Sequence, residues 1–127
     1  MTALQPWLLV GLGGALGAMA RFGVGRLFAA RLPPGFPYAT LFINLTGCFL
    51  IAAFLSAAAE RTALSEHWRY LFPIGFVGAY TTFSTYEWEL VSLANGGQWL
   101  RMGIYFVLSN GVGLAAVILG SAMGRRL

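Results

Sequence analysis

Hydrophobic residues fill most of the chain in four long stretches, at about residues 7–28, 38–59, 70–94 and 100–123. Each stretch is longer than the roughly 20 residues with which a helix crosses the hydrocarbon core of a bilayer. Short segments separate them: a proline-rich turn at residues 33–37, a polar segment at residues 60–69 and Asn-Gly-Gly at residues 95–97. The pattern predicts an all-α integral membrane protein, in which four transmembrane helices form a single domain over residues 1–127.

The composition argues against the soluble alternatives to this prediction. Charged residues make up 9% of the chain and hydrophobic residues 58%, whereas a typical soluble domain is about 25% charged. A water-soluble bundle would have to hide four helices with almost no polar face. A cleaved signal peptide does not fit the first stretch, because residues 1–20 carry no basic n-region. The basic residues are scattered arginines, so nucleic acid is not an expected partner.

Basic residues are spread evenly over the two sides of the predicted bundle. One side carries Arg61, Arg69, Arg125 and Arg126, and the other carries Arg26, Arg31 and Arg101, with Arg21 deeper in the first helix. Because Lys and Arg normally collect in cytoplasmic loops, this balance predicts insertion in both orientations and an antiparallel pair of chains. The alternative is that a weak bias, the lipid or the insertion machinery selects one orientation, and charge counting favours neither.

Polar side chains recur at every fourth residue on two of the predicted helices. Thr40, Asn44 and Cys48 form such a file on the second helix, and Tyr105 and Ser109 form one on the fourth, with Asn110 one position beyond Ser109. Polar groups inside a membrane are costly, so each file indicates either a contact between helices or a transport path. The spacing favours the two alternatives about equally for Thr40 and Asn44, since interhelical hydrogen bonds use the same residue types.

The middle of the third stretch is a poor helix. Residues 75–86 contain two glycines and four serines or threonines, which favour backbone conformations other than the helix. The composition predicts that the third helix opens near residues 78–82. Irregular backbone at membrane depth is tolerated only where it is buried in protein or lines a cavity. The opening would free carbonyl oxygens for a cation and hydroxyls for an anion, and Phe83 adds an electropositive ring edge.

The remaining charged or reactive groups give no sign of an enzyme. Arg21 either reaches toward the interface or lines a wet vestibule, and Glu87 and Glu89 fit a solvated helix end. The chain has one histidine, His67, one cysteine inside an apolar run and no aspartate, so it offers no catalytic triad, metal cluster or acid and base pair. No nucleotide-binding motif is present.

Three motifs make the sequence resemble the Fluc (CrcB-type) fluoride channel family over essentially its whole length. They are residues 13–18 with Arg21, residues 44–47, and the long motif at residues 75–85. The resemblance implies an antiparallel, dual-topology homodimer in the cell (inner or plasma) membrane, with two pores that let fluoride leave the cytoplasm passively. It also implies a structural sodium ion at the dimer centre, held by backbone carbonyls of Gly78 and Thr81.

The resemblance also implies roles for individual side chains. The residues that it assigns to the fluoride pore are Asn44, Phe83, Tyr86, Thr82, Thr40, Tyr105 and Ser109, with Arg21 in the vestibule and Glu89 as an acidic residue near the pore. Tyr86 departs from the family, whose motif usually has a second Phe there. The substitution keeps the ring edge but adds a phenolic donor beside the expected second fluoride position.

Two other functions compete with the channel. A small dual-topology multidrug or cation exporter has a similar size and helix number, but it needs an acidic residue deep in the first helix, and this chain has none there. A membrane assembly subunit would use the glycines and hydroxyls for packing alone. Because four short helices do not enclose such a pore unaided, we expect a homodimer surrounded by lipid, with fluoride as the transported ion.

Overall fold

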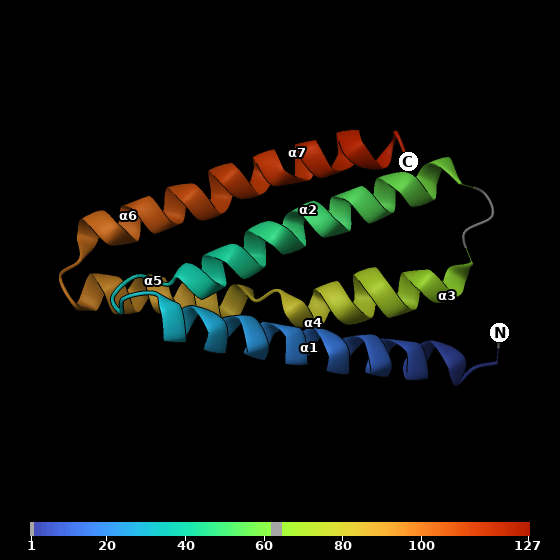
Figure 1. Cartoon of the computed structure of the whole chain (residues 1–127), viewed down its shortest axis with the longest axis horizontal. Helices are drawn as coiled ribbons and strands as arrows, with labels where there is room; N and C mark the ends of the chain where they lie inside the picture. Colours follow the sequence, from blue (N-terminus) through green and yellow to red (C-terminus); the bar gives the residue numbers. More distant parts are fainter. Residues whose placement is uncertain (1, 62–64) are drawn as a thin grey trace.

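The computed structural model describes residues 2–61 and 65–127, and the regular elements of these residues are all helical. In chain order they are α1 (Gln5–Arg31), α2 (Tyr38–Glu60), α3 (Glu66–Arg69), the π-helix η1 (Tyr70–Val77), α4 (Gly78–Tyr80), α5 (Phe83–Asn95), α6 (Trp99–Val107), the π-helix η2 (Leu108–Val112) and α7 (Gly113–Gly124). These elements form four helical segments (Figure 1). The predicted all-α fold class is therefore confirmed.

The third segment is interrupted at the place that the sequence predicts. Thr81 and Thr82 adopt extended backbone, with φ/ψ of −81°/160° and −151°/117°, between α4 and α5. The thin connection between α4 and α5 is visible in Figure 1. The helix α5 begins directly after this break, with the Thr82 hydroxyl accepting a hydrogen bond from the Thr85 N–H.

Three helices are long and apolar enough to cross a membrane: Gln5–Arg31, Tyr38–Glu60 and the continuous α6, η2 and α7 at Trp99–Gly124. The third segment does not qualify by this criterion because its break divides it into shorter pieces. It still runs alongside the others (Figure 1). A chain with three uninterrupted spans and one broken segment is the coarse architecture that the hydrophobic pattern predicts.

Glycines allow the segments to pack in two close pairs. α1 lies against η1, where a Cβ atom at Gly13 or Gly17 would overlap the backbone of Leu71 or Phe76. α2 lies against α7, where a Cβ atom at Gly120 would overlap the carbonyl oxygen of Phe49. Both chain termini lie at the same end of the molecule, as an even number of segments requires (Figure 1).

The isolated chain buries little of its apolar surface. Only 11%, 22% and 11% of the most apolar windows of the three long helices are buried, and large side chains such as Trp7, Phe22 and Phe83 are exposed. A soluble protein rarely exposes apolar surface on this scale. These faces need lipid or a second chain to cover them.

Candidate functional site

Asn44 holds the break of the third segment by two hydrogen bonds. Its Nδ2 donates to the Thr82 carbonyl oxygen at 2.9 Å, and its Oδ1 accepts from the Thr82 N–H at 2.8 Å. The amide thus replaces the helical acceptor that the Thr82 N–H has lost. It also adds a donor to the Thr82 carbonyl oxygen, which at the N-cap of α5 accepts the first hydrogen bond of that helix as well. Nδ2 carries a second hydrogen, which remains available to another acceptor. The contact between segments that the sequence offers as one interpretation of Asn44 is therefore present. The second hydrogen of Nδ2 can donate to a transported anion as well.

The break also changes the hydrogen bonding of neighbouring carbonyl groups. The Thr81 N–H and hydroxyl both donate to the Val77 oxygen, at 3.0 and 2.9 Å. The Gly78 oxygen, in contrast, has lost its helical donor, because the Thr82 N–H turns to Asn44 instead. Gly78 lies at the surface of the single chain. A hard cation such as sodium prefers oxygen ligands of this kind, so the Gly78 carbonyl suits the predicted ion chemically.

Side-chain metal ligands do not gather elsewhere in the described ranges. Residues 2–61 and 65–127 contain no group of three or more His, Cys, Asp or Glu side chains that could hold a metal ion.

Glu89 forms the centre of a second polar cluster, which joins three helices. The Thr40 hydroxyl of α2 donates to Oε1 at 2.8 Å, and the Tyr105 hydroxyl of α6 donates to Oε2 at 2.7 Å. Thr40 and Tyr105 are 6% and 0% exposed, so both hydroxyls depend on this carboxyl group. The interpretation of Glu89 as a solvated helix end is therefore wrong. Two hydroxyl donors hold this carboxyl group in one position.

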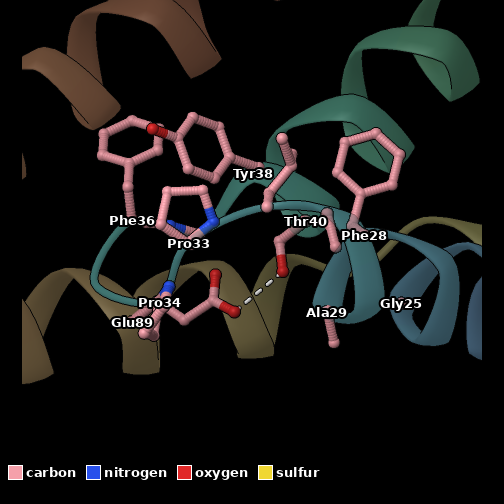
Figure 2. A pocket seen from close by; sticks show the side chains of 12 residues that line it. Gly25, Phe28, Ala29, Pro33, Pro34, Phe36, Tyr38, Thr40 and Glu89 are labelled. Atoms are coloured by element: carbon pink, nitrogen blue, oxygen red, sulfur yellow. Dashed lines mark hydrogen bonds between the residues drawn. The ribbon is translucent and has the colours of Figure 1, made fainter.

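A cavity of about 380 Å³ opens beside this cluster, and we call it the proline cavity. Its lining includes Pro33, Pro34 and Pro37 from the turn between α1 and α2, together with Thr40 and Glu89. Figure 2 shows the Glu89 carboxyl group beside Pro34 and below Pro33, with its hydrogen bond to Thr40. The proline cavity thus leads to one face of the Glu89 cluster.

A second cavity of about 290 Å³ lies beside the break, and we call it the break cavity. Its lining includes the predicted site residues Asn44, Thr82, Phe83, Tyr86 and Ser109, together with Thr81 and Asn110. The structure therefore gathers five of the seven predicted pore residues at one cavity. The other two, Thr40 and Tyr105, belong to the Glu89 cluster.

Aromatic rings connect the break cavity with the Glu89 cluster. The ring centroids of Phe83 and Tyr86 are 5.9 Å apart, and the Tyr86 and Tyr105 rings meet edge to face at 5.2 Å and 73°. Tyr86 is buried, at 5% exposure, but Phe83 is 72% exposed. The Phe83 ring therefore lies at the outer wall of the break cavity, where one chain alone does not enclose it.

Arg21 does not join these residues. It is partly buried on α1 and belongs to the lining of neither the break cavity nor the proline cavity. Its predicted position in a vestibule stays a prediction.

Asn110 is a cavity residue that the site prediction does not include. Its Nδ2 donates to the Tyr86 hydroxyl at 2.8 Å and to the Phe106 carbonyl oxygen at 2.9 Å. The fourfold spacing of Tyr105 and Ser109 points to those two residues, but η2 widens the helix from Leu108 to Val112 and alters the face presented after Tyr105. A second asparagine inside a membrane span is the one signal that could have identified Asn110.

Comparison with known proteins gives consistent matches over nearly the whole chain. Residues 8–121 match the family model described as "CrcB-like protein, Camphor Resistance (CrcB)". The Fluoride-specific ion channel FluC of Acidobacterium capsulatum is 48% identical over 123 residues, which cover 97% of this chain and 98% of the relative. The protein of the same name from Rhizobium leguminosarum bv. trifolii is 41% identical over 120 residues, covering 94% of this chain and 96% of the relative.

Proposed function

The chain belongs to the CrcB-like family, and from this membership we propose that it is a passive, fluoride-selective channel of the cell inner membrane that lets fluoride leave the cytoplasm. It is a channel and not an enzyme, in keeping with relatives named as fluoride-specific ion channels. The small exporter is not favoured, because the first acidic residue of the sequence is Glu60, at the end of α2.

The observation that carries the proposal is the group of neutral donors around the break cavity. The amide of Asn44, the hydroxyls of Ser109 and Tyr86 and the ring edge of Phe83 line a space that contains no lysine or arginine. Fluoride is small and strongly hydrated, so a pore must replace its water with close donors yet avoid a fixed charge that would trap it. Amide, hydroxyl and ring-edge groups meet both requirements.

A homodimer accounts for the open wall of this cavity. The 72% exposed ring of Phe83 has no cover within the chain, and the apolar faces of the three long helices are equally uncovered. A second chain that packs on these faces would complete one pore on each side of the assembly. We propose that the second chain is antiparallel, which the balanced arginine count supports.

A sodium ion at the dimer centre would stabilise the break. The carbonyl oxygens of Gly78 and Thr81 would hold it, and its charge would draw anions toward a site that has no basic side chain of its own. Removal of sodium from the purified dimer should weaken its assembly.

Fluoride efflux from liposomes tests the proposed function. Vesicles that contain the purified protein are loaded with potassium fluoride, valinomycin carries the potassium, and a matched potassium chloride sample is the control. We expect rapid fluoride release that depends on valinomycin, with far slower chloride release. No fluoride release from folded protein would overturn the proposal.

Labelling of the two membrane sides tests the antiparallel arrangement separately. A cysteine tag at the C-terminus of the chain, in a variant in which Cys48 is replaced by Ala, is reacted with an impermeant reagent from one side of intact cells. About half of the tags should react in a dual-topology dimer. Uniform labelling from one side would contradict it.

A further inference from the structure

Tyr86, Ser109 and Asn110 form a polar group on the break cavity that the break itself does not use. Tyr86 comes from α5, and Ser109 and Asn110 come from η2. The hydrogen bonds of Asn44 stabilise the break without them. Their arrangement therefore needs its own explanation.

The Asn110 amide has only one orientation that satisfies its surroundings. The nitrogen donates to the Phe106 carbonyl oxygen at 2.9 Å. If the amide were reversed, its oxygen would face that carbonyl oxygen, and two acceptors would repel each other. The Phe106 carbonyl thus fixes Asn110 as a donor. The same nitrogen lies 2.8 Å from the Tyr86 hydroxyl, so this hydroxyl must accept from Asn110.

A tyrosine hydroxyl that accepts from Asn110 keeps its own hydrogen for another partner. The hydrogen bonds of the described residues give it no acceptor. Ser109, on the same cavity, has a buried hydroxyl oxygen with no hydrogen-bond partner among residues 2–61 and 65–127. A buried polar group without a partner costs about 1–3 kcal/mol. Two hydroxyl groups therefore have unused hydrogens at one cavity.

We propose that Tyr86 and Ser109 form an anion subsite in which the Tyr86 hydroxyl donates directly to fluoride, with Asn110 as the positioning residue that turns this hydroxyl into a donor. The subsite deepens the proposed channel function and rests on it for its physiological ligand. It differs from a site built on ring edges, because an O–H group binds a small anion through a strong, directional hydrogen bond. Tyr86 thus acts through its hydroxyl as well as its ring.

Fluoride titration of the purified protein in detergent, followed by tyrosine ultraviolet difference spectra, tests the subsite without any need for conduction. Wild type should show a tyrosine difference band that saturates with sodium fluoride and is absent with sodium chloride. Tyr86→Phe should abolish the band. Tyr80→Phe is the matched control, because the Tyr80 hydroxyl bonds Thr46 at 3.0 Å and does not line the break cavity. That control should keep the full band.

A double-mutant comparison tests the role of Asn110. Asn110→Leu should raise the half-saturating fluoride concentration of the band about threefold or more, because the Tyr86 hydroxyl is no longer held as a donor. In efflux assays, Asn110→Leu should slow fluoride release in the wild-type background and have no further effect when combined with Tyr86→Phe. Equal slowing in both backgrounds would show that Asn110 acts independently of Tyr86 and would overturn the positioning role.

The two readouts separate this proposal from the proposed function. A fluoride band that Tyr86→Phe removes, in a protein without efflux, would support the subsite and overturn the channel. Fluoride efflux without a band, or with a band that survives Tyr86→Phe, would support the channel and overturn the subsite. Absence of both would overturn both.

Discussion

Two interfaces inside the bundle, that of α1 with η1 and that of α2 with the third segment, use different chemistry. At the glycine interface, Gly13 and Gly17 of α1 and Gly75 of η1 bring two backbones into direct contact. Within the described residues, no side-chain hydrogen bond crosses from α1 to η1. At the polar interface, Thr40 and Asn44 of α2 meet Glu89 and Thr82 through side-chain hydrogen bonds.

The glycine interface holds the helices in position, whereas the polar interface carries the residues of the candidate site. Close backbone packing tolerates no added atom, so the glycine interface fixes where η1 lies. The polar interface places donors and acceptors that a ligand or a neighbouring chain can share. We therefore expect substitutions in the glycine interface to change folding. Substitutions in the polar interface should change fluoride transport more than folding.

Gly17→Ala should have the largest effect on folding. A methyl group there would overlap the backbone of Phe76, so α1 and η1 must separate, at a cost of about 3 kcal/mol or more. Gly23→Ala is the matched control, because nothing lies within 4 Å of its added atom. Thermal unfolding in detergent should show strong destabilisation by the first change and none by the second. Equal melting temperatures would show that this interface is loose.

Asn44→Ala should have the largest effect at the polar interface. It leaves the buried Thr82 N–H without its acceptor and removes one of the donors to the Thr82 carbonyl oxygen, which costs about 2 kcal/mol. Fluoride efflux per folded protein should fall by at least about tenfold, which corresponds to about 1.4 kcal/mol. Asn95→Ala, at an exposed position at the end of α5, should leave efflux unchanged. Wild-type efflux from Asn44→Ala would contradict a role of the amide in conduction.

Glu89→Gln should change fluoride efflux less than Asn44→Ala does. The amide has one acceptor oxygen where the carboxylate has two, so either Thr40 or Tyr105 loses its acceptor, at a cost of about 1 kcal/mol. The freed hydroxyl and the lost negative charge should lower the half-saturating fluoride concentration for efflux by about twofold to fivefold. Glu87→Gln, at an exposed position, is the control. It should change neither the stability of the protein nor the half-saturating fluoride concentration. A higher half-saturating concentration in Glu89→Gln would instead indicate that the carboxylate assists entry.

The sequence predicts local features of this chain better than its contacts between segments. The break at Thr81 and Thr82 follows from nearby glycines and hydroxyl residues, and the structure confirms it. The contact of Glu89 with Thr40 and Tyr105 depends on which helices become neighbours, 49 and 16 residues apart in the chain. A single sequence does not contain that information in readable form.

Helix geometry explains why Asn110 escapes the site prediction. Fourfold spacing assumes a regular α-helix, and Tyr105 and Ser109 satisfy it. The wider π-turn at Leu108–Val112 changes the angle between successive residues. Asn110 consequently reaches the Tyr86 hydroxyl, while the Ser109 hydroxyl has no partner among the described residues. Local spacing does not reveal such a change of helix type.

The reversal potential of single channels in a planar lipid bilayer tests the central claim most directly. The protein is studied with a tenfold fluoride gradient and equal chloride on both sides. A passive fluoride-selective channel must carry zero current close to the fluoride equilibrium potential, about 59 mV for a tenfold gradient of a monovalent ion. A reversal potential near zero would mean that chloride carries the current, and a reversal potential of the opposite sign would mean that the cation carries it; either result would contradict the account.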